Sequence, residues 1–377
     1  MTDSPSGTPS MHTQSMKKQY KPNILLPSLT GRSWRWVFFF LFFLLLPLSL
    51  PAQGADTLRV MWYNVENLFD CNDEPGKDDE EFLPEGKNKW TPYRYWQKQR
   101  NLARVIAAVG DQRLPDIIGL CEVEGDTVLT DLTRRSPLRT AGYRYIVTHS
   151  PDERGVDVAL LYLPGRFRPL VHQSISINGG DRPTRDILHV RGLVSPTDTL
   201  DLFLCHLPSR RGGERQSRPF RLQAAQTLRK AIDSLYRHTP QAKVVVMGDF
   251  NDNLTNTRVA QALGVAPSAR TSSGFSPSLI SLNVDKQPGT YAYQGRWEVI
   301  DHLLVSPNLT NPTESLYTTP ATLSRIATLP FLLTTDEKYG ISIPHRTYIG
   351  PRYQGGFSDH LPVVADFIRK EISESTE

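Results

Sequence analysis

Cysteine is scarce in this sequence, which holds three cysteines in 377 residues. Three cysteines do not make a disulfide framework of the kind that stabilises small secreted domains. Cys121 and Cys205 each end an apolar run, so we expect both thiols to be buried. Cys71 has no leucine-rich stretch before it and is a poor lipid-attachment site. The cysteines therefore argue against a cysteine-based metal site.

An excess of charge of one sign is also absent from most of the chain. Residues 1–54 carry a formal charge of +4, which equals that of the whole chain, so residues 55–377 net to zero. A molecule without net charge has no long-range field that would attract a polyanion. Binding of DNA or RNA would therefore require a local basic patch.

Only one long hydrophobic run is present, at residues 37–50, and it is nearly pure Phe and Leu. The segment before it is basic, and small residues follow at 51–55. A basic flank, a short apolar core and a small-residue exit are typical of an export signal. The run is short for a membrane span, but an uncleaved anchor remains the alternative. Translation could also begin at Met16.

Apolar periodicity predicts an α/β protein with much antiparallel pairing. No internal repeat is found, and residues 306–354, rich in Thr, Pro and Leu, are interpreted as a long insertion with a partial helix. The inner stripe of the second predicted helix is expected to include Phe220, Leu228 and Ile232. Helices are predicted over 93–109 and 215–237, and strands over 57–65, 116–123, 143–149, 156–163, 187–193, 199–207, 244–247, 290–293, 298–305 and 361–367.

Polar residues adjoin two of the predicted buried strands. Asp249 and Asn251 come at the end of the run 244–247, and alternation places them on the same side. Ser358, Asp359 and His360 directly precede the run 361–367. Two such strand ends predict a carboxylate-lined pocket at one edge of a sheet, suited to a hard divalent cation and to phosphate-ester hydrolysis. The alternative for residues 248–251 is a simple turn, since Gly, Asp and Asn all favour turns.

An ordered set of motifs resembles the endonuclease/exonuclease/phosphatase superfamily, whose members include DNase I, exonuclease III and the inositol-polyphosphate and sphingomyelin phosphodiesterases. The set is Asn64, Glu122, His206, Gly248-Asp-Phe-Asn251, Ile300-Asp-His302 and Ser358-Asp-His360, and the resemblance covers about residues 57–369. It implies a four-layer α-β-β-α sandwich of two mixed, largely antiparallel sheets. It also implies that residues 1–54 are an N-terminal extension, 55–370 the catalytic domain and 371–377 a polar tail.

The resemblance implies a role for each matched residue. Asn64, Glu122 and Asp359 would hold Mg²⁺ or Mn²⁺, with Ca²⁺ as a further option. Asp249 would prepare the attacking water, and Asn251, His206 and His360 would stabilise the phosphoryl oxygens. Asp301 is expected to orient His360, and Asp157 is expected to orient His206. His302 is expected simply to pack, and the acidic run from Asp73 to Glu81 to be a solvated loop.

Basic residues flank these motifs. Arg210 and Arg211 follow His206, and Arg346 and Arg352 precede the last motif. Guanidinium groups match phosphate oxygens well, so these four are candidate substrate-binding residues. The alternative for each is a solvated loop position.

The sequence therefore predicts an exported, bacterial-type phosphodiesterase that depends on a divalent metal. The expected reaction is direct attack of water on phosphorus, most simply in DNA or RNA. The alternative substrates are phosphate monoesters and lipid phosphodiesters, and a further alternative is a non-enzymatic binding protein on the same fold. We expect a monomer with no protein partner, located in the periplasm, at the cell surface or outside the cell. The leader would contact the membrane during export and would anchor the protein if it is not cleaved.

Overall fold

The computed structural model describes residues 56–177, 183–196, 198–255, 257–266, 277–283, 286–318 and 320–370. The predicted export signal and the predicted tail at 371–377 lie outside the described residues. Residues Gly54–Glu377 group as one compact unit. Among the residues described, none of the helices has both the length and the apolar character that a membrane crossing requires.

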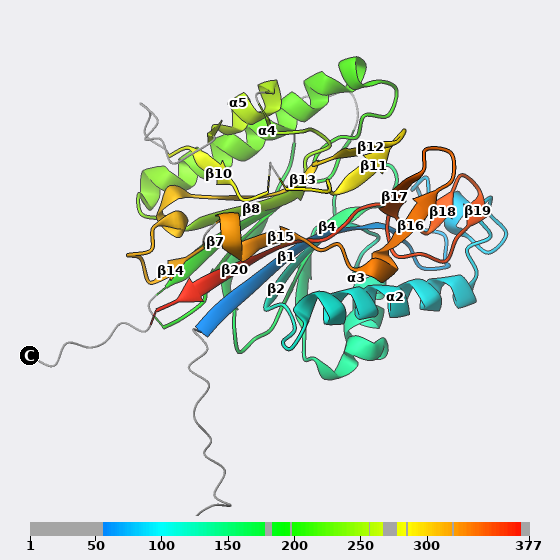
Figure 1. Cartoon of the computed structure of the whole chain (residues 1–377), viewed down its shortest axis with the longest axis horizontal. Coiled ribbons are helices and arrows are strands. Elements are labelled where there is room, and N and C mark those ends of the chain that lie inside the picture. Colours follow the sequence, from blue (N-terminus) through cyan, green and yellow to red (C-terminus); the bar gives the residue numbers. More distant parts are fainter. Residues whose placement is uncertain are drawn as a thin grey trace, which may run out of the picture. The chain divides into compact units, whose positions relative to one another are not determined.

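Two seven-stranded sheets form the centre of this unit (Figure 1). The strand pairs β1–β2, β7–β8 and β9–β10 are parallel, and the other described pairs are antiparallel. The first sheet runs in the order β14 (Leu316–Tyr317), β20 (Val363–Arg369), β1 (Asp56–Leu68), β2 (Ile117–Val123), β4 (Asp157–Tyr162) and β3 (Arg144–Val147), with β15 (Ser324–Ile326) also paired to β20. The second runs β5 (Arg168–Ile175), β6 (Ile187–Leu193), β7 (Thr199–His206), β8 (Val244–Asp249), β13 (Asp301–Val305), β10 (Leu279–Ser281) and β9 (Val265–Ala266).

Shorter elements surround the sheets. The helices are α2 (Pro92–Gly110), α3 (Asp126–Thr130), α4 (Glu214–His238), α5 (Arg258–Leu263) and α6 (Pro320–Leu323), with one π turn at Asp131–Arg135. Single 3₁₀ turns lie at Glu80–Phe82, Pro137–Thr140, Pro307–Thr310 and Pro330–Leu332. Three small hairpins are β11 (Tyr291–Tyr293) with β12 (Arg296–Glu298), β16 (Leu333–Asp336) with β17 (Ile341–Pro344), and β18 (Tyr348–Ile349) with β19 (Arg352–Tyr353).

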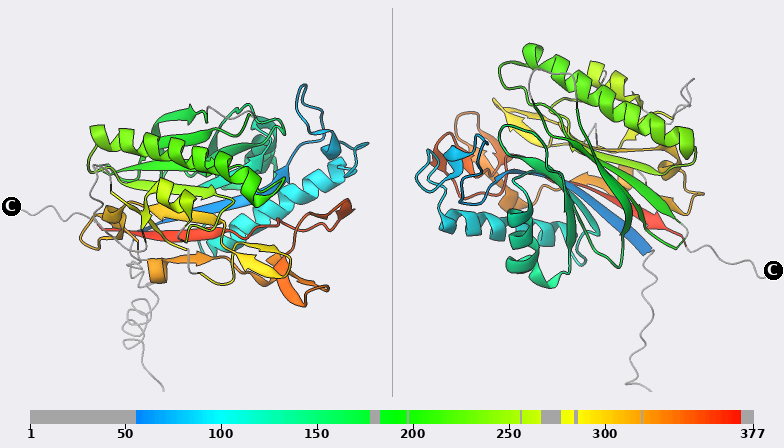
Figure 2. Two further views of the ribbon diagram at one scale, coloured as in Figure 1. Left: turned by 90° about the horizontal axis from the view of Figure 1, so that it is seen from above. Right: turned by 180° about the vertical axis from the view of Figure 1, so that it is seen from behind.

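Alternation along the strands sorts side chains between three apolar layers. In β1, Val60 and Trp62 point between the two sheets, whereas Met61 and Tyr63 point toward α2. A third cluster packs α4 and α5 on the other face of the second sheet. The sheets approach closely at Gly119, where a Cβ atom would lie 2.5 Å from the sulfur of Met247. Helices therefore cover both outer faces (Figure 2), and the predicted four-layer α-β-β-α sandwich is confirmed.

The rotation of α4 differs from the prediction. Its buried face is formed by Arg221, Ala225, Leu228 and Ile232. Phe220, predicted to lie in the inner stripe, is instead 36% exposed. Helical periodicity fixes which residues share a face, but the packing against the second sheet decides how that face is centred.

Most of the predicted strands are confirmed. Strands β9 and β10 of the second sheet were not predicted. Strand β5 was not predicted, because it is an edge strand whose side chains are mostly exposed and whose sequence does not alternate. The predicted strand 298–305 is divided between β12 and β13. The segment 306–354 has a helix of only four residues, and it is more than an insertion, because β14 and β15 complete the first sheet.

Candidate active site

One edge of the sandwich collects the polar strand ends. β1 and β2 end there together, as do β7 and β8, because each pair is parallel. β13 begins there, with Asp301 opposite Asp249, because it is antiparallel to β8. The amide of Asn64, on the first sheet, donates to Asp249 Oδ2 on the second sheet at 3.1 Å. The predicted motifs on both sheets therefore meet in one site.

Asp249 lies at the centre of this site and is 1% exposed. Its carboxylate accepts from the backbone N–H of Asn251 and from Asn64. Burial, followed by the nearby charge of Asp301, raises the pKa of Asp249 to about 7. A carboxyl group that titrates near neutrality is suited to take a proton from water. Gly248 is required here for space rather than for a turn, since a Cβ atom would lie 2.5 Å from the sulfur of Cys205.

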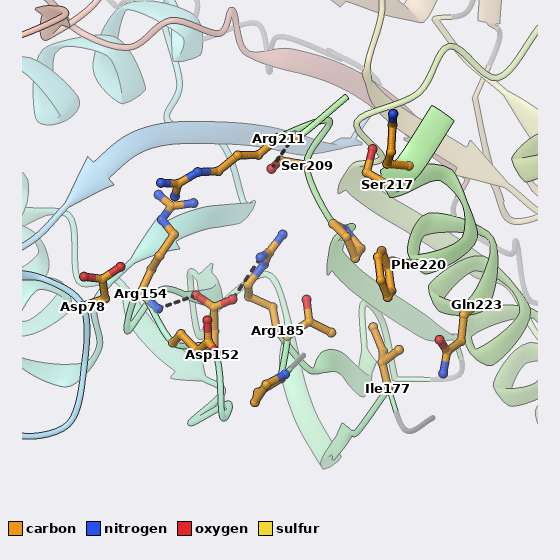
Figure 3. Close-up of a pocket in the computed structure, with 16 residues that line it drawn as sticks. Asp78, Asp152, Arg154, Ile177, Arg185, Ser209, Arg211, Ser217, Phe220 and Gln223 are labelled. Carbon is orange, nitrogen blue, oxygen red and sulfur yellow. Dashed lines mark hydrogen bonds and ion pairs between the residues drawn. The ribbon is translucent and has the colours of Figure 1, made fainter. Parts of the chain in front are cut away.

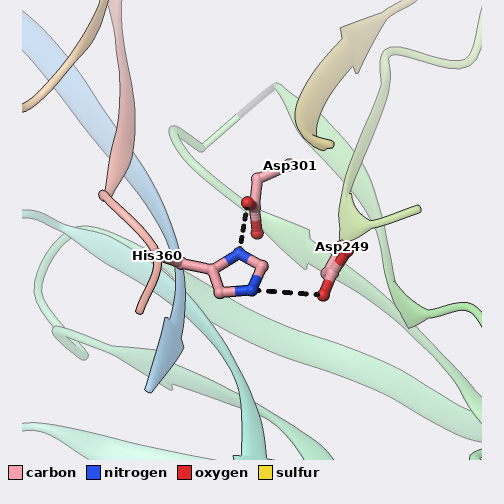
Figure 4. A group of neighbouring side chains, drawn as sticks. All are labelled: Asp249, Asp301 and His360. Carbon is pink, nitrogen blue, oxygen red and sulfur yellow. Dashed lines mark hydrogen bonds and ion pairs between the residues drawn. The ribbon is translucent and has the colours of Figure 1, made fainter. Parts of the chain in front are cut away.

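Asp301 and His360 form a buried pair beside Asp249 (Figure 4). Nδ1 of His360 lies 2.6 Å from Asp301 Oδ2, and the indole N–H of Trp62 donates to Asp301 Oδ1. Burial opposes a charge on His360, but the attraction of Asp301 outweighs it and raises the pKa of the imidazole well above its usual value. Nε2 lies 3.9 Å from Asp249 Oδ2. His360 is therefore held as an imidazolium whose free N–H faces the site.

The Asp301→Asn variant is expected to lower kcat about 10²-fold, within the range of an acid–base group. Without the carboxylate, burial dominates and the pKa of His360 falls. Because the protonated form is then lost at lower pH, the alkaline limb of the pH–rate profile should move toward acid. The measurement is kcat for a phosphate diester as a function of pH.

A second buried Asp–His pair supplies the control for this experiment. His189 Nε2 lies 2.9 Å from Asp201 Oδ1, near the start of β7 and five residues from His206. Asp201→Asn should leave the pH–rate profile in place. Equal losses in the two variants, with both folded, would contradict the assignment of Asp301.

His206 is buried and neutral. Burial, with the charges of Arg185 and Arg154, lowers its pKa well below the usual value. Its Nε2 lies 3.6 Å from Asp249 Oδ2 and 3.8 Å from Glu122 Oε1, and among the described residues its Nδ1 has no hydrogen-bond partner.

The prediction that Asp157 orients His206 was wrong. Asp157 does lie at the same edge, opposite Val123. Its carboxylate, however, accepts from the hydroxyls of Thr148 and Ser150 and from the backbone N–H of Ser150. The side chain thus ties β4 to the preceding loop, and it makes no contact with His206.

The three predicted metal ligands do not form one cluster. Glu122 accepts from the backbone N–H of Asn67, and Asn64 is bonded to Asp249. Asp359 pairs with Arg346, 2.5 Å from its guanidinium. Within the described part of the chain, the acids and histidines whose donor atoms lie within 4.8 Å of one another are Asp249, Asp301 and His360. We assign that group to proton chemistry, because an imidazolium held by Asp301 has no lone pair to offer a metal.

The remaining oxygen donors nevertheless fit a hard divalent cation. Glu122 is partly exposed at the strand end; its Oε1 lies 3.8 Å from the neutral ring of His206, and its Oε2 lies 3.6 Å from Arg154. Carboxylate and amide oxygens such as those of Glu122 and Asn64 are the ligands that Mg²⁺ and Mn²⁺ prefer. Burial, followed by the charge of Asp359, raises the pKa of Glu66 to about 7 against the opposing charges of Lys98 and Arg346.

Sequence reasoning missed a buried lysine that supports this edge. Nζ of Lys98, on α2, donates to Thr347 Oγ1 and to the carbonyl of Phe357 and lies 3.9 Å from Glu66 Oε2. Glu66 in turn accepts from the backbone N–H of Thr347. The signal was present, because Lys98 falls on the apolar stripe of its helix, three residues after Tyr95.

The four predicted substrate-binding arginines differ in whether they contact the site residues. Arg346 joins Asp359, and Arg210 donates to the carbonyl of Asn251 and pairs with Glu298. Arg211 is exposed just beyond them. Arg352 does not reach the site: it lies exposed in the β18–β19 hairpin, and no described contact connects its side chain to the site residues.

The backbone is strained around the same residues. Seven described residues other than glycine have positive φ, and four of them are at this edge: Glu66, Asn67, Glu122 and Asn251. Such conformations are costly for residues with a Cβ atom and concentrate at functional sites. Their gathering here supports a functional rather than a structural role for the edge.

Known structures share this fold at low sequence identity, while the search of curated protein sequences gave no match. An endonuclease/exonuclease/phosphatase family protein from Bacteroides thetaiotaomicron aligns at 16% identity and a TM-score of 0.51, over 84% of this chain and 99% of that chain. A mannosyl-6-phosphatase of the same organism gives 17% and 0.51, over 82% and 99%. A humanized D. rerio TDP2 gives 16% and 0.50, over 82% and 98%. The family profile matches residues 59–370, so the chain belongs to the endonuclease/exonuclease/phosphatase family and is a phosphoric ester hydrolase.

Proposed function

We propose that this protein is a divalent-cation-dependent phosphodiesterase that hydrolyses nucleic acid by direct attack of water on phosphorus. The observation that carries the proposal is the convergence of Asn64, Glu122, His206, Asp249 and the Asp301–His360 pair at one edge. These residues supply a base, an imidazolium and hard oxygen ligands within one site. No side chain is placed as a nucleophile, so a covalent intermediate is not proposed.

Each residue has a chemical task in this scheme. Asp249 takes the proton of the attacking water, and its pKa of about 7 matches that task. The imidazolium of His360 donates to a phosphoryl oxygen, whose charge grows in the transition state. The neutral His206 and Asn251 line the same side of the site; Asn251 is fixed by donation to the carbonyl of Leu207.

Glu122 and Asn64 would hold the cation, while Asp359 is paired with Arg346 in this structure. A bound Mg²⁺ or Mn²⁺ would neutralise phosphate charge and polarise the phosphorus–oxygen bonds. Ca²⁺ satisfies the same kind of oxygen donors, and the metal dependence of the rate would identify the ion used.

The choice of nucleic acid rests on local charge. The chain past residue 54 has no net charge, yet Arg154, Arg185 and Arg211 gather in one pocket beside the site. Asp78, Asp152 and Glu153 line the same pocket, Arg185 pairs with Asp152, and Arg154 pairs with Glu122. Arg211, which has no ion-pair partner among the described residues, is therefore the cation that supports contact with a nucleic-acid phosphate.

A substrate panel tests the proposal. The purified chain, with Mg²⁺ or Mn²⁺, should hydrolyse single-stranded DNA or RNA faster than sugar phosphates or sphingomyelin. Preference for a monoester would move the assignment to a phosphatase, and preference for sphingomyelin would move it to a lipid phosphodiesterase. Binding of these substrates without hydrolysis would indicate a non-enzymatic binding protein.

We also propose that residues 1–54 direct export. The evidence is the basic flank and the short apolar run at 37–50. In a secreting bacterial host, N-terminal sequencing should find a mature chain that starts near residue 55, outside the cytoplasm. A full-length chain recovered from the membrane would show an anchor instead, and one recovered from the cytoplasm would contradict export.

A further inference from the structure

A pocket of about 630 Å³ opens beside the candidate active site (Figure 3). Its walls come from the loop before β4, the residues before β6, the loop after β7 and the start of α4. A volume in this range accommodates a whole small molecule. It is therefore larger than the phosphate group under attack requires.

The pocket is joined to the catalytic residues by direct contacts. Arg154, in its wall, lies 3.6 Å from Glu122 Oε2. Arg185, also in its wall, donates to the carbonyl of Leu207, which also accepts from the amide of Asn251. A group bound in the pocket could therefore belong to the same substrate molecule as a phosphate held at the site.

Three guanidinium groups and three carboxylates line the pocket, and two of the guanidinium groups are already in ion pairs, Arg185 with Asp152 and Arg154 with Glu122. Arg185 is 6% exposed and pairs with Asp152, but its Nε has no hydrogen-bond partner among the described residues. The side chains of Arg154 and Arg211 point toward one another in Figure 3. Arg211 has no ion-pair partner within the described ranges. Two converging cations, one of them unpaired, fit a phosphate between them. The acids that also line the pocket are Asp78, Asp152 and Glu153.

Phe220 and Ile177 lie across the pocket from Arg154 in Figure 3, on the side that also carries Ser217 and Gln223. Pro183 and Pro208 also line the pocket. Phe220 is one of the few large apolar side chains exposed in the described structure, because α4 turns Arg221 rather than Phe220 toward the core. An exposed ring on a pocket wall offers a surface on which a nucleobase can stack.

We infer that this pocket is the subsite for the nucleotide next to the scissile phosphate. Arg154 and Arg211 hold its own phosphate, and its base packs on Phe220 and Ile177. The base must be unpaired to enter, so the substrate is single-stranded DNA or RNA. A lipid chain is disfavoured by the three arginines. This inference rests on the proposed nuclease function and specifies its substrate class.

The experiment compares two substrates in each variant: a short single-stranded oligothymidylate, and bis(4-nitrophenyl) phosphate, a diester that lacks bases and a second phosphate. The readout is the ratio of kcat/KM for the first to that for the second. Phe220→Ala should lower this ratio about 10-fold or more, the size expected for one lost base stack. Arg211→Ala should lower the ratio by a similar factor. Phe220→Trp, which keeps an aromatic ring, should have a ratio close to that of the wild type.

Arg237→Ala is the matched control, since Arg237 is exposed at the far end of α4 and outside the pocket. Its ratio should equal that of the wild type. If the wild type cleaves both substrates and the ratio is unchanged in Phe220→Ala and Arg211→Ala, the subsite is overturned while the nuclease function stands. If the wild type cleaves only the small diester, the nuclease function itself is overturned. Thermal melting curves check that each variant is folded.

Discussion

Replacing Asp249 with asparagine is expected to lower kcat for a phosphate diester by about 10²–10⁴-fold, the range associated with loss of a positioned base. The amide is nearly isosteric but has no basic lone pair of comparable strength. Asp249 also faces His360 and accepts from Asn64, so the substitution removes a charge that both neighbours use. The measurement is steady-state kinetics at saturating cation, where the loss should appear in kcat rather than in KM.

Asp157→Asn is the matched control for this variant. Asp157 is also a buried aspartate at the same edge, but its carboxylate serves Thr148 and Ser150. We expect it to lose thermal stability and to keep kcat within about 10-fold, since it supplies neither base nor ligand. If Asp157→Asn and Asp249→Asn, both folded, lost activity equally, the separation of the two aspartates would be wrong.

Removing divalent cations with an excess of chelator is expected to lower the rate at least about 10³-fold, and adding Mg²⁺ or Mn²⁺ should restore it. Without the cation, only His360 and the arginines remain to neutralise the charge of the phosphate. Glu122→Gln should raise the cation concentration needed for half-maximal rate about 10²-fold or more, because a charged oxygen ligand becomes a neutral one. The measurement is the rate as a function of free cation concentration.

Glu124→Gln provides the comparison two residues further along. Burial, with the charge of Asp70, raises the pKa of Glu124 to about 8, so this carboxyl group is largely protonated at neutral pH. The amide therefore resembles its native state, and the cation dependence should not change. A rate that survives the chelator, or a Glu124→Gln variant that needs as much cation as Glu122→Gln, would count against the placement of the cation at Glu122.

Local patterns were sufficient for the two long helices and for most of the strands, whereas the identity of the site depended on the resemblance of its motifs to a known family. The apolar run ending in Asp249 and Asn251 defined β8 and placed both polar groups at its end. Asn64, Glu122 and His206 were located by the resemblance to the endonuclease/exonuclease/phosphatase superfamily, since each taken alone could equally be a structural residue at a strand end. Strand β5 escaped this reasoning because an exposed edge strand has no buried face to impose alternation.

The partners of the site residues needed long-range information. Asn64 and Asp249 are 185 residues apart and belong to different sheets, yet they share a hydrogen bond. Asp157 had the right residue type at the right edge, but its carboxylate turned to Ser150. Lys98 and Glu66 lie on different elements, and the loop containing Thr347 unites them.

The sequence by itself determined an α/β protein with much antiparallel pairing, because burial imposes periods that are visible over a few residues. The resemblance of its motifs to a known family supplied the sandwich and the chemistry of the strand ends. Only the tertiary structure decided which carboxylate serves which histidine, that Phe220 faces a pocket and that Arg352 stays outside the site. Those outcomes depend on how a helix is rotated and which loops meet, and both are set by packing between residues far apart in the chain.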